Sequence, residues 1–245
     1  MCTLAISWRV DRRWPIVVAA NRDERLGRPS ESWALRDGQG GVRLAAPRDV
    51  LGGGTWIGVS ARGVFAGLTN FHAPFAWYPD PARRSRGEIV NAALAAPSAA
   101  AAREALRALD AARWNPFHLA VADGADAFLW WYDGERTALV DLSPGLHVVT
   151  ERSPDGRCPR GELVRARWPL DPSVPRIAEL LTVHAPPAES ATCIHGDPAY
   201  GTRSSAVLRL APALSASELY VADARPCLSP LEDRSDVLAA LARTA

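Results

Sequence analysis

The sequence predicts an α+β protein with antiparallel sheets, organised as a single domain over residues 1–245. Strand-like and helix-like segments are grouped as strands, then helices, then strands, and such segregation favours antiparallel sheets over alternating βαβ units. Short turn sequences, such as Ala61-Arg62-Gly63 and Asp133-Gly134-Glu135, separate neighbouring strand-like runs as in hairpins. No internal repeat or clear linker divides the chain, and 245 residues suffice for a substantial core.

The first half is predicted to contain strands followed by helices. Short apolar runs predict strands at Thr3–Trp8, Ile16–Ala20, Trp56–Val59 and Val64–Thr69. Ser85-Arg86-Gly87-Glu88 has the spacing of a capping box, which predicts that a helix begins there. The alanine-rich stretch Ala99–Ala111 carries Leu106 and Leu109 at helical spacing and predicts a second helix.

The second half is predicted to return to strands. They are expected at Leu119–Val121, Phe128–Tyr132, Thr137–Val140, Leu146–Thr150, Ser205–Leu210 and Leu219–Ala222. The arginine- and proline-rich segment from Arg152 to Pro175 is expected to be a loop with one short helix, Arg160–Arg167. A short helix at Ser235–Ala242 is expected to close the chain.

The composition excludes several classes of function. Charged residues make up 22% of the chain and the net charge is +1, so we expect no nucleic-acid partner. All 28 basic residues are arginine, which excludes a Schiff-base lysine, a Walker-A lysine and a lysine general base. The start is too short in apolar length for a signal peptide, and no stretch approaches about 20 apolar residues. We therefore expect a cytoplasmic protein without a transmembrane segment.

The start of the chain carries the main candidate for chemistry. Cys2 immediately precedes a predicted strand, and removal of Met1 would place a thiol and a free α-amine on this one residue. An α-amine titrates near about 7.7–8.0 and a free thiol near about 8.5, so each can assist the other. A nucleophile that carries its own general base is the chemistry of N-terminal nucleophile hydrolases. The alternative is that Cys2 is a small buried apolar residue.

Further candidates follow two of the predicted strands. In Asn21-Arg22-Asp23-Glu24, the arginine can hold an anionic group or lower the thiol pKa, and the aspartate can accept a hydrogen bond from the α-amine. Asn70 carries a side-chain N–H suited to an oxyanion, and His72 lies close behind it. Both segments are also typical of solvated turns. The glycines before Trp56 are expected to allow close backbone packing beside a ligand.

Cys193, His195 and Asp197 alternate, so on a strand they would share one face as possible metal ligands. Three ligands need a fourth ligand or an open position. Pro198 directly after them favours a loop, and we expect no metal.

Six motifs follow one another along the chain in the order typical of one family. They are the Met-Cys start, Val17-Val18-Ala19-Ala20-Asn21-Arg22-Asp23-Glu24, Gly53-Gly54-Thr55-Trp56-Ile57-Gly58-Val59, Ala66-Gly67-Leu68-Thr69-Asn70-Phe71, Ser85-Arg86-Gly87-Glu88 and Tyr200-Gly201-Thr202-Arg203-Ser204-Ser205. This arrangement resembles the NRDE family, the relatives of the eukaryotic transport-and-Golgi-organisation protein. More distantly it is similar to choloylglycine hydrolases and penicillin V acylase. The resemblance implies the four-layer αββα sandwich of N-terminal nucleophile hydrolases.

The resemblance also implies roles for individual residues. Cys2 would be nucleophile and carrier of the base, Asp23 would orient the α-amine, and Asn70 would supply an oxyanion donor. The expected substrate contacts are Asn21, Arg22, Glu24, Trp56, Phe71, His72 and Arg203. The second asparagine of the acylases falls near Thr150-Glu151, where a carboxylate would repel an oxyanion, and their C-terminal arginine falls near Arg203 or Arg209.

Two functions are therefore open. The first is hydrolysis of a linear non-peptide amide through a Cys2 thioester, which requires no cofactor. The second is non-catalytic binding or trafficking of haem, an acyl-CoA or another amphipathic ligand, because relatives in the NRDE family have been associated with haem trafficking and lipid handling.

Overall fold

The first of two sheets contains the N-terminal strand. Its strands are β1 (Cys2–Trp8), β2 (Ile16–Arg25), β10 (Gly145–Thr150), β11 (Tyr200–Leu210), β12 (Glu218–Ala222) and β13 (Glu232–Asp233). They lie in the order β10-β1-β2-β11-β12-β13, and every neighbouring pair is antiparallel. Cys2 lies opposite Arg22, and Thr3 lies between Asn21 and Thr150. This computed structural model describes residues 2–72 and 79–244.

The second sheet is an antiparallel meander. It consists of β3 (Ser30–Asp37), β4 (Arg43–Asp49), β5 (Ile57–Ser60), β6 (Phe65–Asn70), β7 (Phe117–Ala122), β8 (Ala127–Tyr132) and β9 (Thr137–Asp141). The strands pair in the order in which they follow along the chain. This confirms the antiparallel sheets predicted from the turn sequences.

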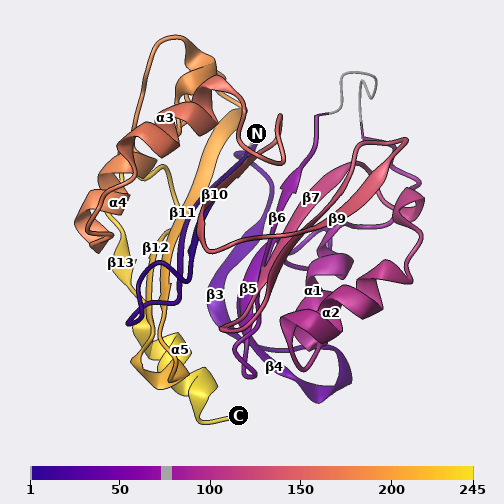
Figure 1. Ribbon diagram of the computed structural model, residues 1–245. Coiled ribbons are helices and arrows are strands. Elements are labelled where there is room, and N and C mark those ends of the chain that lie inside the picture. Colours follow the sequence, from indigo (N-terminus) through magenta and orange to yellow (C-terminus); the bar gives the residue numbers. More distant parts are fainter. Residues whose placement is uncertain (1, 73–78, 245) are drawn as a thin grey trace.

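The described helices pack against the two sheets, four of them on the outer faces and the last, which contacts both sheets, against the core between them. They are α1 (Gly87–Ala95), α2 (Ala99–Arg107), α3 (Pro159–Arg167), α4 (Val174–Leu181) and α5 (Ser235–Ala242). Short 3₁₀ turns are η1 (Gln39–Gly41), η2 (Ala111–Arg113), η3 (Ala188–Ser190) and η4 (Leu214–Ala216). Figure 1 shows α3 and α4 outside the first sheet and α1 and α2 outside the second, which is the expected αββα layering. No helix of the described ranges is long and apolar enough to cross a membrane.

The main core lies between the two sheets, and strand alternation determines which side chains enter it. In β1, Leu4 and Ile6 are buried in the same core cluster as Phe65 of the second sheet. Ala5 instead faces the helix layer and packs in the cluster that includes residues of α3 and α4. Because side chains two residues apart share a face, Cys2 is turned toward the second sheet together with Leu4 and Ile6.

β2 is longer than the sequence predicts. The prediction that Asn21, Arg22, Asp23 and Glu24 follow the strand was wrong, because the strand continues to Arg25. β1 and β11 flank β2 on both sides and pair with this polar segment. Alternation then directs Asn21 and Asp23 to the helix layer and Arg22 to the space between the sheets.

Other elements also differ from the prediction. The helix predicted after Ser85 is confirmed as α1, but no capping box forms, because its N-cap is Arg86 without a side-chain hydrogen bond. β3 and β4 were not predicted, since their apolar positions are few and Pro47 interrupts the second of them. α4 was not predicted, and only its first two residues lie in the segment that was expected to be a loop. Its proline occupies the first turn, where a missing N–H costs no helical hydrogen bond.

Candidate active site

Cys2 lies at the beginning of an inner strand, where its sulfur and its backbone nitrogen have different surroundings. The thiol lies 3.9 Å from the carbonyl oxygen of Asp23. The backbone N–H donates a hydrogen bond to Oε2 of Glu151 over 3.4 Å. Burial raises the pKa of the Cys2 thiol, so this thiol needs a base to act as a nucleophile at neutral pH.

The nitrogen of Cys2 faces a buried group of two carboxylates and one guanidinium. Arg160 Nη1 lies 2.9 Å from Glu151 Oε2 and 3.8 Å from Asp23 Oδ2. All three side chains are at most 2% exposed. The hydroxyl of Thr202 donates to Asp23 Oδ1 over 2.6 Å, whereas Oδ2 accepts no hydrogen bond from any described residue. Burial raises the pKa of Asp23 to about 7.

Each member of this group comes from a different element. Asp23 lies in β2, Glu151 directly follows β10, and Arg160 lies in the first turn of α3. Arg160 is held in place because its Nε donates to the carbonyl oxygen of Ala191 over 2.6 Å. The sequence places Arg160 in a short helix but gives no sign that it is buried beside Asp23. The carboxylate expected to repel an oxyanion is instead paired with Arg160 and directed at the nitrogen of Cys2.

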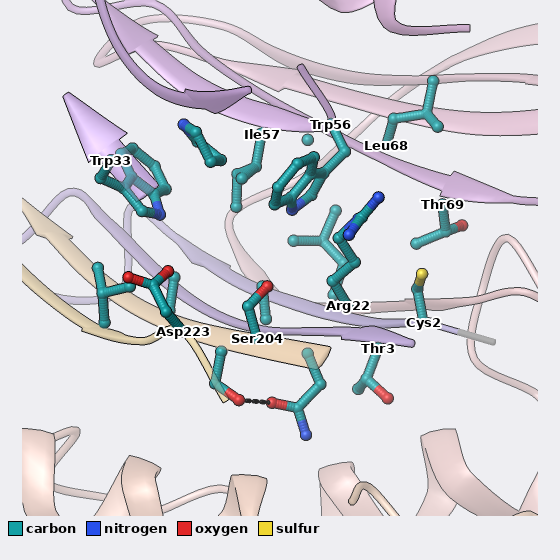
Figure 2. Close-up of a pocket in the computed structure, with 18 residues that line it drawn as sticks. Cys2, Thr3, Arg22, Trp33, Trp56, Ile57, Leu68, Thr69, Ser204 and Asp223 are labelled. Carbon is teal, nitrogen blue, oxygen red and sulfur yellow. Dashed lines mark hydrogen bonds between the residues drawn. The ribbon is translucent and has the colours of Figure 1, made fainter. Parts of the chain in front are cut away.

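Arg22 lies beside the thiol in the space between the sheets (Figure 2). Its guanidinium carbon is 4.1 Å from the ring centroid of Trp56, and Nη2 donates to Asp49 Oδ2 over 3.3 Å. Glu24 is also within 3.6 Å of Nη2. Nη1 is buried and has no hydrogen-bond partner among the described residues, so it can donate a hydrogen bond to a ligand oxygen without giving up a protein contact.

A cleft of about 690 Å³ opens from Cys2. Asn70, at the end of β6, lines it together with Cys2, Glu24 and Trp56. Among the described residues, six arginines also line it: Arg22, Arg25, Arg28, Arg83, Arg84 and Arg86. A second, narrow pocket of about 30 Å³ extends from Cys2 between the sheets toward Trp33 and Ile57 (Figure 2). Cys2 thus lies where a wide cationic cleft meets a small, largely apolar pocket.

The structure separates the other predicted contacts from this cleft. The Nδ2 group of Asn21 donates to the carbonyl oxygens of Leu181 and Thr192, and Oδ1 accepts from Ser205, so its amide ties β2 to the helix layer. Phe71 lies with its ring 4.3 Å from that of His118.

His72 is exposed, and its backbone N–H donates to the carbonyl oxygen of Glu151. Arg203 occupies the bulge of β11 and donates to the carbonyl oxygen of Asp223. Arg209 pairs with Glu218 over the ring of Trp14. Arg160 is the arginine that approaches Asp23. Arg203 and Arg209, near which the C-terminal arginine of the acylases was expected to fall, make the other contacts described above.

A model of the family described as Transport and Golgi organisation 2 matches residues 1–169. The chain belongs to this family. The Transport and Golgi organization protein 2 homolog of Homo sapiens is 33% identical over 147 residues, which cover 55% of this chain and 50% of that protein. The homolog of Mus musculus is 39% identical over 80 residues, 31% of this chain and 27% of its own length. The chain thus spans half or less of these curated relatives.

Solved structures of hydrolases share the fold. The Caenorhabditis elegans ortholog of N-acylethanolamine-hydrolyzing acid amidase has a TM-score of 0.55 at 12% identity, over 85% of this chain and 92% of that one. Penicillin V acylase from Agrobacterium tumefaciens has a TM-score of 0.55 at 14% identity, over 97% of this chain and 88% of that chain. A mutant of conjugated bile acid hydrolase from Clostridium perfringens has a TM-score of 0.52 at 9% identity, over 95% of this chain and 96% of that chain. At these identities the likeness shows the fold alone.

Proposed function

We propose that this chain of the Transport and Golgi organisation 2 family is an N-terminal cysteine amidohydrolase acting on a linear non-peptide amide. The observation that carries the proposal is the hydrogen bond from the Cys2 nitrogen to Glu151 Oε2, in the same buried charged group as Asp23. These buried acceptors suit an α-amine, which has more N–H donors than the peptide nitrogen it would replace. Met1 lies outside the described residues, and its removal is part of the proposal.

The charges around the nitrogen leave such an amine able to act as a base. Glu151 is balanced by Arg160, and Asp23 is only partly ionised near neutral pH because of its raised pKa. A full pair of unbalanced carboxylates would instead hold the amine as an ammonium. The neutral amine can therefore take the proton of the Cys2 thiol, whose own pKa is raised by burial.

The reaction then proceeds in two balanced steps. The Cys2 sulfur forms a bond to the amide carbonyl carbon, Asn70 donates a hydrogen bond to the oxyanion, and the α-ammonium gives its proton to the departing amine. Water, deprotonated by the same α-amine, attacks the thioester and releases the acid. Amide and water thus become acid and amine, and Cys2 is regenerated.

The cleft indicates the chemical class of the substrate. The arginines outnumber the four acidic residues that line the cleft, and the free Nη1 of Arg22 lies next to Trp56. An amide with a carboxylate or similar anionic group is therefore favoured. The narrow pocket of about 30 Å³ has room only for a small apolar group next to the scissile carbonyl.

The test begins with the intact mass of the untagged protein before and after limited iodoacetamide treatment. We expect loss of Met1 and selective alkylation of Cys2, followed by turnover of anionic acyl amides. Cys2→Ala should lower kcat/KM by more than about 10³-fold, since it removes the nucleophile, while the control Cys158→Ser keeps activity. Retention of Met1 together with an unreactive Cys2, or equal activity of Cys2→Ala, would refute hydrolysis.

The extent of the arginine-lined cleft favours a second candidate, binding of an amphipathic anion such as haem. Arg83 and Arg84 line the cleft along with Arg22 and offer partners for propionate groups. In that case haem titration should give the same affinity for Cys2→Ala as for the wild type. The Arg83→Gln/Arg84→Gln variant should bind more weakly. Unchanged binding by this double variant would exclude the cleft as the haem site.

A further inference from the structure

Four potential metal ligands converge at the end of the first sheet where β11 begins and β12 ends. They are His184, Cys193, His195 and Cys227, and one ligand atom of each lies within 4.8 Å of all the others. His184 follows α4, Cys193 and His195 lie between η3 and β11, and Cys227 follows β12. The sequence pattern suggests only Cys193 and His195, because His184 and Cys227 lie at distant positions of the chain. Asp197, the third alternating residue, does not join them; its Oδ1 accepts from the N–H of Ala199.

Two distances from Sγ of Cys193 match the edges of a zinc tetrahedron. With Zn–S near 2.3 Å and Zn–N near 2.0–2.1 Å, a tetrahedral ion places two sulfurs about 3.8 Å apart and a sulfur and a nitrogen about 3.6 Å apart. Sγ of Cys193 lies 3.6 Å from Sγ of Cys227 and 3.5 Å from Nε2 of His195. Nε2 of His195 lies 3.0 Å from Sγ of Cys227. The ring of His184 lies edge-on to that of His195, with centroids 4.5 Å apart.

We propose that His184, Cys193, His195 and Cys227 bind one structural Zn²⁺ ion. Two thiolates and two imidazoles form a closed ligand set of the type that selects zinc and leaves no position for substrate. Two thiolates also balance the charge of the ion, so the site is neutral. The exposed rings of His184 and His195 give the ion access from solvent, while Cys193 is buried beneath them.

The proposed ion would fasten three connecting segments to the sheet that carries the candidate active site. Cys193 is followed by Ile194, whose N–H donates a hydrogen bond to Oγ1 of Thr202 over 2.7 Å. The N–H of Thr202 donates back to the carbonyl oxygen of Ile194 over 3.1 Å. The same Thr202 hydroxyl donates to Asp23. Zinc would therefore stabilise the segment that positions Thr202 against Asp23, without touching Cys2.

The competing state is a disulfide between Cys193 and Cys227. Both cysteines are free in the structure, and a sulfur separation of 3.6 Å is far longer than a disulfide bond of about 2.0 Å. A disulfide would leave His184 and His195 without a role, whereas a zinc site uses all four side chains as ligands. The two states are exclusive and can be distinguished by mass.

The experiment uses the full chain, purified without chelators, with one portion kept in a thiol reductant and one portion without it. We expect about one zinc ion per chain by elemental analysis. After zinc removal, Co²⁺ should give the d–d and thiolate charge-transfer bands of a tetrahedral site, and zinc should raise Tm. Absence of both zinc and cobalt bands from reduced wild-type protein, or a Cys193–Cys227 disulfide in the protein as purified, would overturn the proposal.

The variants separate metal binding from folding. Cys227→Ser and His184→Ala should weaken zinc binding by at least about 100-fold, since even changes outside the ligand shell cost about 10–100-fold. His184 is exposed, so its replacement leaves the core intact. The controls Asp197→Asn and Cys158→Ser should bind zinc as the wild type does. A His184→Ala protein with unchanged cobalt spectrum and zinc affinity would contradict the four-ligand site.

Discussion

Asp23→Asn replaces a fully buried carboxyl group by a neutral amide of nearly the same shape. In the folded protein burial raises the pKa of Asp23 from 3.8 to about 7. Between these two values the folded state binds a proton that the unfolded state has lost. The contribution of Asp23 to the free energy of unfolding must therefore decrease as pH rises through this interval, and level off above about pH 7.

The size of this effect follows from the interval. The slope is at most about 1.36 kcal/mol per pH unit and weakens near pH 7, so the contribution of Asp23 falls by about 2 kcal/mol between pH 5 and pH 7. In Asp23→Asn this contribution is absent. The stability of the variant relative to the wild type should therefore rise by the same amount over this range, whatever the difference at pH 5.

Urea unfolding followed by the fluorescence of the nine tryptophans gives the free energy of unfolding at each pH. The difference curve is the free energy of unfolding of the variant minus that of the wild type at each pH. This subtraction cancels the titration of all other groups, provided that intact mass shows the same N-terminus in both samples. Asp49→Asn is the matched control. Partial burial alone would raise the pKa of Asp49, but the hydrogen bond from Arg28 and its neighbours lower it. Its difference curve should therefore be flat from pH 5 to pH 7.

A flat difference curve for Asp23→Asn would refute the reasoning. It would mean that the carboxylate is ionised in the folded state throughout this range, so that the charge balance proposed around the α-amine fails.

Three further predictions follow from the same site. Arg160→Met leaves Asp23 and Glu151 buried without their cation and should lower the free energy of unfolding by about 3–5 kcal/mol at neutral pH, measured by urea unfolding; a loss below about 1 kcal/mol would contradict the buried pairing. Asn70→Ala removes the oxyanion donor and should lower kcat by about 10²–10³-fold with little change in KM, measured on an amide that the wild type hydrolyses; a change in KM alone would assign Asn70 to substrate binding instead. Arg22→Gln should raise KM for an anionic amide but not for its neutral analogue, and equal effects on both would argue against charge recognition by Arg22.

Much of the architecture could be predicted because it depends on local pattern. Apolar runs between turn residues located most of the strands, and Ser235–Ala242 matches α5 as observed. β3 escaped prediction because most of its side chains are only partly buried. The polar half of β2 was misread as a turn, since polarity alone does not reveal that two neighbouring strands supply its backbone hydrogen bonds.

The sequence by itself determined the family, the layered fold and the candidate nucleophile, because motifs and periodicity are properties of short segments. Only the tertiary structure decided what surrounds the nucleophile. Glu151 reaches the nitrogen of Cys2 across 149 positions of the chain, and Arg160 reaches Asp23 from another element. The proposed zinc ligands meet in the same way. Buried charges and ligand sets depend on which loops the sheet order brings together, and no local pattern encodes that order.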